Sequence, residues 1–240
     1  MTRLAYHETL GVLDAGDLHP GGAEATAFLL DELEKAHPRR VLEVGAGIGR
    51  TTDRMLARGW EVVALEPNPV LRACFSARHP APARPERLEH FAHPGPAFDA
   101  AIGESVFYAM DLPAAFARLH DLLRPGGLLA FVDLVWTDRG DHALAARVHD
   151  ATRAIFGIPM TSRQRLTWTD WRRALEDAGF VAVAERQVGT SARASVRVGL
   201  SRVVRHPATF ASYLRYALFA PHVDIPEGTV ESRMAVWRRA

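Results

Sequence analysis

The chain has 240 residues, of which 48% are hydrophobic and 24% charged, a composition that suits one α/β domain with a full core. The net charge is +1, and Cys74 is the single cysteine, which excludes an intrachain disulfide and a thiolate metal cluster. Because no apolar stretch has the length of a membrane span and the N-terminus lacks the apolar part of a signal peptide, we expect a cytoplasmic protein without a membrane partner.

Helical and extended patterns alternate along the first half of the chain. They predict a helix from Gly22 to about Pro38, a strand at 41–44, a helix at 50–58 ended by Gly59, and a strand at 61–65. Next come a helix from Pro69 to about Arg78 capped by Asn68, a proline-rich loop at 79–85, a short strand near 87–91 and a buried strand at 98–102.

The second half continues this alternation. It predicts a helix at 113–123 after Asp111, a turn at 124–127, a strand at 128–134, a helix at 170–178 capped by Thr169, a strand at 180–188 and a helix at 207–219. Apolar strands separated by helices indicate a parallel sheet covered on both faces. Residues 194–205 have two interpretations, because 195–200 alternates like a strand but the segment could also be helical, with a final strand that is short or missing. We favour the helical interpretation.

A glycine-rich turn follows the strand at 41–44. Gly45, Gly47 and Gly49 let the backbone pass close to a ligand where a side chain would collide. The helix that begins at Arg50 directs unpaired N–H groups and the positive end of its dipole at this turn. The dinucleotide fingerprint G-x-G-x-x-G would require a third glycine where Arg50 stands, so a dinucleotide is not predicted.

The motif Glu43-x-Gly45-x-Gly47-x-Gly49, with Glu66 at the end of the next strand, resembles the class I S-adenosylmethionine-dependent methyltransferases of the small-molecule type. The resemblance covers residues 20–188. It implies a Rossmann-like, doubly wound α/β fold with a mostly parallel sheet and with N-terminal and C-terminal helical lid segments. It also implies S-adenosylmethionine as cofactor and S-adenosylhomocysteine as product.

The resemblance assigns roles around the turn. Gly45, Ala46 and Gly47 would run beneath the methionine part of the cofactor, and Glu43 would orient its ammonium group. Glu66 would accept hydrogen bonds from both ribose hydroxyls, the alternative being a capping or surface glutamate. The complete predicted set of cofactor-binding residues is Glu43, Gly45, Ala46, Gly47, Gly49, Glu66, Pro67, Phe91 and Gly103; Phe91 would pack on adenine or lie in the core.

Candidate catalytic residues follow the strand at 98–102. Methyl transfer needs few side chains, because positioning the acceptor and excluding water supply most of the acceleration. Glu104 is predicted to accept a proton or hold an amine, and Tyr108 to position the acceptor; a helix-start carboxylate and a buried aromatic are the alternatives. His7 is predicted to close the active site, with a surface arm as the alternative.

The chain is expected to form a single methyltransferase domain. Its predicted parts are an N-terminal lid at 1–22, a cofactor-binding core at 23–135, a substrate lid at 136–168, the end of the core at 169–188, and a C-terminal helical cap or final strand at 189–240. In the substrate lid, Asp138, Asp141, His142 and His149 are conceivable metal ligands. A charged lid helix explains them equally, and no metal is predicted.

The C-terminal part is basic. Between Arg186 and Ala240 there are nine arginines and three acidic residues, a local charge of +6. This excess would suit an anionic acceptor, but the arginines are dispersed, which favours solvated or ion-paired faces and gives no nucleic-acid track. Because the sequence shows no added RNA- or DNA-binding module, the resemblance leads us to expect methyl transfer to an O, N or C atom of a small molecule. The alternatives are a cofactor-binding cyclase or rearrangement enzyme on the same fold and a non-catalytic binding subunit.

Overall fold

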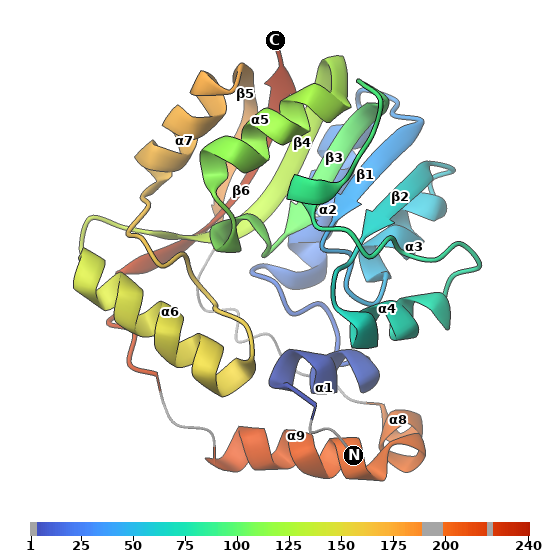
Figure 1. Ribbon diagram of the computed structural model, residues 1–240, viewed down its shortest axis with the longest axis vertical. Helices are drawn as coiled ribbons and strands as arrows, with labels where there is room; N and C mark the ends of the chain where they lie inside the picture. Colours follow the sequence, from blue (N-terminus) through green and yellow to red (C-terminus); the bar gives the residue numbers. More distant parts are fainter. Residues whose placement is uncertain (1–3, 189–198, 220–222) are drawn as a thin grey trace.

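Among the residues that the computed structural model describes, 4–188, 199–219 and 223–240, six strands form one sheet in the order β2-β1-β3-β4-β6-β5 (Figure 1). The strands are β1 (Arg40–Val44), β2 (Glu61–Leu65), β3 (Phe98–Glu104), β4 (Leu123–Trp136), β5 (Phe180–Val188) and β6 (Val230–Arg239). The pairs β2–β1, β1–β3 and β3–β4 are parallel, whereas β6 lies antiparallel between β4 and β5. The predicted mostly parallel α/β fold is confirmed.

Helices cover both faces of this sheet (Figure 1). The described helices are α1 (Tyr6–Val12), α2 (Gly22–Glu34), α3 (Arg50–Leu56), α4 (Pro69–Ser76), η1 (Leu88–His90), η2 (Phe107–Ala109), α5 (Leu112–Leu122), α6 (His142–Phe156), α7 (Trp168–Asp177), α8 (Leu200–Arg205) and α9 (Pro207–Phe219). No helix of the described ranges has both the length and the apolar character that crossing a membrane requires.

Two hydrophobic layers follow from the alternation of side chains along the strands. Leu42 of β1 belongs to the cluster that contains the buried residues of α5 and α7, while Val41 belongs to the cluster formed with α2 and α3. Successive residues of a strand point to opposite faces, so each apolar strand feeds both layers. The parallel strands consequently end at a common edge, where β1 meets β3 at the pair Val44 and Gly103.

Several local predictions are confirmed. The side-chain oxygen of Asn68 accepts hydrogen bonds from the backbone N–H groups of Val70 and Leu71, so Asn68 caps α4 with Pro69 in the first helical turn. Strands β2 and β5 and helix α9 have the predicted bounds. These elements carry strong local signals, which explains why their ends were predictable.

Three element predictions are wrong. The turn expected at 124–127 lies within strand β4. The segment near 87–91 forms the short helix η1 in place of a strand, because pairing beside β2 is limited to one bridge between Leu65 and Arg84. Helix α7 begins at Trp168, not at 170, because Thr167 caps it and Asp170 accepts a hydrogen bond from the Thr167 N–H at 2.9 Å.

The end of the sheet also differs from the interpretation that we favoured. Residues 200–205 are helical, and 194–198 lie outside the described residues, but the final strand is neither short nor missing. Strand β6 has ten residues and pairs on both sides. Its buried Trp237 packs in the layer of α5 and α7, and the adjacent Val236 packs in the layer of α2, so β6 completes both layers.

Because β6 pairs on both sides and buries Trp237, the substitution Trp237→Ala should strongly destabilise the fold. The indole is completely buried, so its removal should lower the free energy of unfolding by about 3–5 kcal/mol, the usual cost of truncating a large buried aromatic side chain. Urea denaturation followed by circular dichroism measures this change. Arg238→Ala, at the exposed neighbouring position, should stay within about 0.5 kcal/mol of the parent, and equal effects of the two substitutions would contradict the assigned position of β6.

Candidate functional site

The turn after β1 is held against the end of β2. The N–H groups of Gly45 and Ala46 both donate to the carbonyl oxygen of Leu65 at 2.9 Å. A Cβ atom at Gly47, whose φ is +58°, would meet no atom within 4 Å, whereas one at Gly49 would collide with His79. Gly47 is therefore the position where the backbone is open to a ligand, and Gly49 serves the packing of α3 against α4.

Glu66 closes this turn. Its buried carboxylate accepts hydrogen bonds from the N–H of Gly47 at 2.9 Å and from the N–H of Asn68 at 2.8 Å, one on each oxygen. Burial raises the pKa of Glu66, and these two backbone hydrogen bonds oppose the shift. Each carboxylate oxygen keeps a further acceptor site. Pro67 lies between Glu66 and Asn68, and its carbonyl oxygen accepts a hydrogen bond from the Arg72 guanidinium at 2.6 Å.

Glu43 lies buried in β1, two residues before Gly45. Its carboxyl group accepts a hydrogen bond from the Thr52 hydroxyl of α3. Burial raises the pKa of Glu43 to about 8, and the nearby negative charges of Glu104 and Glu66 act in the same direction. The folded protein therefore holds a proton on Glu43 that an exposed glutamate would release.

Glu104, at the carboxyl end of β3, is held by three groups from other elements. Its Oε1 accepts a hydrogen bond from the Thr26 hydroxyl of α2 at 2.7 Å, and its Oε2 accepts one from the Thr51 hydroxyl of α3 at 2.6 Å. The Nε2 atom of His19 lies 3.5 Å from Oε1. Sequence reasoning missed these three partners, although Thr51 stands directly after the predicted helix start at Arg50.

The turn after Glu104 rests on a buried carboxyl group. Asp133 of β4 accepts a hydrogen bond from the Phe107 N–H at 3.1 Å, and burial raises its pKa well above the usual range. The backbone at Gly103 leaves no room for a Cβ atom, which would meet Phe107 at 2.7 Å. Tyr108 is buried and donates its hydroxyl hydrogen to the carbonyl oxygen of Pro159, so it binds the loop after α6. Burial also raises the pKa of Tyr108, which keeps the phenol protonated.

His7 links the N-terminal helix to the same edge of the sheet. Its Nε2 lies 3.1 Å from the amide nitrogen of Asn68, two residues after Glu66, and its Nδ1 lies 3.3 Å from the carbonyl oxygen of Phe156 at the end of α6. The Tyr6 and Phe156 rings also pack together, with centroids 5.0 Å apart. The structure thus brings α1 and α6 together over the carboxyl ends of the strands.

Contacts within the protein account for Phe91 and for three of the conceivable metal ligands in 136–168. Phe91 is buried, with the Arg84 guanidinium 5.6 Å from its ring centre, so the geometry offers core packing in place of stacking on adenine. Asp141 caps α6, Asp138 pairs with Arg165, and the His149 ring contacts the carbonyl oxygen of Thr161 at 2.9 Å. Within the described ranges, no three His, Cys, Asp or Glu side chains converge as a metal site would require.

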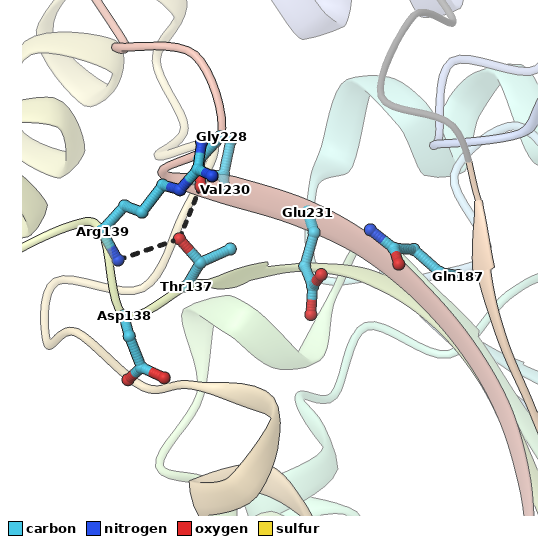
Figure 2. Close-up of a pocket in the computed structure, with 7 residues that line it drawn as sticks. All are labelled: Thr137, Asp138, Arg139, Gln187, Gly228, Val230 and Glu231. Atoms are coloured by element: carbon cyan, nitrogen blue, oxygen red, sulfur yellow. Dashed lines mark hydrogen bonds between the residues drawn. The ribbon is translucent and has the colours of Figure 1, made fainter.

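A separate cavity of about 460 Å³ lies beyond the carboxyl end of β4 (Figure 2). It is lined by Thr137, Asp138, Arg139, Gln187, Gly228, Val230 and Glu231. The Thr137 hydroxyl donates to the carbonyl oxygen of Gly228 at 2.6 Å and accepts from the Arg139 N–H at 3.2 Å, as Figure 2 shows. None of the predicted cofactor-binding residues lines this cavity, and its three contributing segments are too far apart in the chain for a sequence pattern to reveal it.

The arrangement favours a ligand with positive charge and hydroxyl groups. Glu66 contacts the open backbone at Gly47, and the negative charges of Glu66 and Glu104 both act on the buried Glu43. A cation would relieve the repulsion among these carboxylates, and vicinal hydroxyls would use the remaining acceptor sites of Glu66.

Comparisons with known sequences identify methyltransferases as relatives. A family model described as a methyltransferase domain matches residues 21–185. An uncharacterized methyltransferase of Mycobacterium tuberculosis is 30% identical over 199 residues, which cover 75% of this chain and 79% of the relative. The malonyl-acyl-carrier-protein O-methyltransferase of Halorhodospira halophila is 30% identical over 146 residues, covering 53% of this chain and 50% of the relative.

Solved structures share the fold. Geranyl diphosphate C-methyltransferase from Streptomyces coelicolor, in complex with S-adenosyl-L-homocysteine, has a TM-score of 0.66 and 16% identity, with 90% of this chain and 75% of that chain covered. The cyclase SpnF has a TM-score of 0.62 and 17% identity, with 98% and 93% covered. At these identities, the similarity establishes the architecture and leaves the reaction to the residues of the site.

The raised pKa of Glu43 predicts a pH-dependent stability. Because folding raises this pKa from 4.5 to about 8, the stabilisation from the bound proton is complete below pH 4.5 and is lost as the pH rises toward 8. The free energy of unfolding of the parent, relative to Glu43→Gln, should therefore fall by more than about 1 kcal/mol between pH 5 and pH 8. Urea titrations at several pH values measure it. Glu61→Gln, at an exposed position of β2, should follow the parent, and parallel curves for the parent and Glu43→Gln would refute the assignment.

Proposed function

The chain belongs to the S-adenosylmethionine-dependent methyltransferase family, and from this membership we propose that it methylates an O, N or C atom of a small-molecule acceptor. It is an enzyme with S-adenosylmethionine as its cofactor. The observation that carries the proposal is the contact between Glu66 and the N–H of Gly47, which sets a buried carboxylate beside open backbone at the end of two parallel strands.

The residues present fit this cofactor. The backbone at Gly47, where a Cβ atom would meet nothing within 4 Å, would let the methionine part pass close by, and Glu66 retains acceptor sites that would take the two ribose hydroxyls. Glu43 would orient the ammonium group, directly or through water. We assign no stacking role to Phe91, because its ring is buried by its own neighbours.

Glu104 is the proposed acceptor-side residue. Bound S-adenosylmethionine supplies a methyl group that its sulfonium has already activated. Glu104 holds an amine acceptor, or takes the proton from an acceptor that begins protonated, on an oxygen that already accepts one hydroxyl hydrogen bond. Thr26 and Thr51 fix the carboxylate in one orientation, which lowers the entropy lost when the acceptor binds.

Tyr108 and His7 position the covering segments in this proposal. Tyr108 holds the loop after α6 through Pro159, and His7 holds α1 against Asn68. Together these contacts exclude water from the sheet edge where the acceptor meets the cofactor. A small acceptor is supported by the geranyl diphosphate named for a structural neighbour, whereas the malonyl group named for the Halorhodospira halophila relative is carried by a protein.

A double-mutant cycle tests the ribose assignment. Glu66→Ala should weaken S-adenosylhomocysteine binding by at least about 1.5 kcal/mol, the scale of a charge-assisted hydrogen bond. The 2′,3′-dideoxy analogue should bind the parent about as weakly, and Glu66→Ala should weaken it little further. Isothermal titration calorimetry measures all four affinities.

The cycle separates direct binding from an effect transmitted through Gly47. If Glu66→Ala weakens the dideoxy analogue as much as the natural product, the carboxylate acts only by shaping the turn and the ribose role is wrong. Glu61→Ala, at the exposed opposite end of β2, should leave both affinities unchanged.

The reaction itself is tested by transfer of labelled methyl groups to a set of small acceptors, in parallel with Glu104→Gln. The substitution should lower turnover by at least about tenfold while leaving the affinity for S-adenosylhomocysteine nearly intact, because a general base contributes to the chemical step. Glu24→Gln, in the exposed first turn of α2, serves as the control.

Two results would change the proposal. Equal losses of turnover and cofactor affinity in Glu104→Gln would place Glu104 in the cofactor site. Conversion of an acceptor without incorporation of label, with the cofactor unchanged, would indicate a cyclase or rearrangement enzyme in place of a methyltransferase.

A further inference from the structure

Two helices at the outside of the molecule expose apolar side chains. Helices α8 and α9 lie beneath α1, at the end of the molecule away from the sheet (Figure 1). Leu200 and Val204, one turn apart on α8, are 78% and 71% exposed. Leu214 and Leu218, one turn apart on α9, are 41% and 70% exposed. We call these four side chains and their two helices the cap surface.

The charges of the cap surface are all positive. Residues 199–219 contain Arg202, Arg205 and Arg215 and no acidic residue. Arg202 pairs with Asp14, 3.3 Å away. Arg205 and Arg215 are exposed, and neither has an ion-pair partner in the part of the chain that the structure describes. The surface thus combines exposed aliphatic side chains with two uncompensated cations.

These properties distinguish among possible partners. Leu and Val are under-represented among the residues that dominate tight protein interfaces, and the exposed aliphatic side chains here are Leu and Val. A twofold dimer through this surface would bring arginines together without a carboxylate from 199–219 to pair with them. Aliphatic side chains that enter the acyl boundary, flanked by arginines at the level of the phosphates, are typical of helices that lie on membranes.

We propose that the cap surface docks onto an anionic lipid bilayer. Docking of this kind needs no spanning helix. It replaces the expectation from the sequence that the protein has no membrane partner, and it does not depend on the identity of the methyl acceptor.

The inner side of the cap connects this surface to the lid. The Tyr216 ring of α9 packs on Tyr6 of α1 with centroids 5.3 Å apart, and the Tyr216 hydroxyl donates to the carbonyl oxygen of Leu4 at 3.3 Å. Helix α1 in turn carries His7 to Asn68, beside Glu66. Binding of α9 to a lipid surface would therefore act on α1, the helix that covers the carboxyl edge of the sheet.

Vesicle co-sedimentation tests the proposal with the full chain. The parent should bind vesicles of equal phosphatidylcholine and phosphatidylglycerol, should bind phosphatidylcholine alone at least about tenfold more weakly, and should dissociate as salt is raised. Leu200→Ser combined with Leu218→Ser should lower the partition coefficient at least about tenfold. Arg205→Gln combined with Arg215→Gln should abolish most of the preference for the anionic vesicles.

The matched control is Val181→Ser combined with Val183→Ser. These valines on the outer strand β5 are 58% and 42% exposed, so their replacement removes exposed aliphatic surface elsewhere. The control should bind like the parent, and all variants should keep the parent's affinity for S-adenosylhomocysteine, which shows that they are folded.

Three outcomes would overturn the proposal. They are absence of binding to anionic vesicles, equal losses in the β5 control and the cap variants, and a concentration-dependent dimer in light scattering that disappears with the Leu200 and Leu218 substitutions. The last would assign the cap surface to a second copy of the chain.

Discussion

The hydrogen bond from the Gly47 N–H to the Glu66 carboxylate is the contact on which the site depends. It joins the ends of two adjacent parallel strands, and the second carboxylate oxygen fixes the N–H of Asn68, which caps α4. Burying a carboxylate is costly unless hydrogen bonds compensate it, and here two backbone donors do so. One side chain thereby sets the shape of the glycine turn, the start of α4 and the place where α1 attaches through His7.

The same contact gives a physical account of the choice of cofactor. Glu66 holds a turn whose backbone is open at Gly47, and the negative charges of Glu104 and Glu66 add to burial in raising the pKa of Glu43 and keeping it protonated. An ammonium or sulfonium group relieves this repulsion, whereas a phosphate would increase it. The glycine turn alone would suit any nucleotide, and the neighbouring carboxylates favour a cationic ligand.

Structural features that depend on neighbouring residues could be predicted from the sequence. Asn68 followed by Pro69 indicates a helix start because both act on the adjacent backbone, and the glycine turn indicates a ligand because a short strand precedes it. The contacts of Glu104 with Thr26, Thr51 and His19 could not be predicted, because they join residues 53 to 85 positions apart that only the parallel sheet brings together. Strand β6 was missed for the same reason, since its pairing with β4 spans about a hundred residues.

The segments that carry the methyl-donor site differ from the segments that cover it. The family match covers residues 21–185, which include the sheet up to β5, the glycine turn and all three carboxylates. Helices α1, α8 and α9 lie outside that range and pack on one another, with Tyr6 between Phe156 and Tyr216. Helix α9 contacts α1, and α1 places His7 against Asn68, beside Glu66. Substitutions in α8 and α9 can therefore alter the covering segments while the glycine turn and the sheet keep their own contacts.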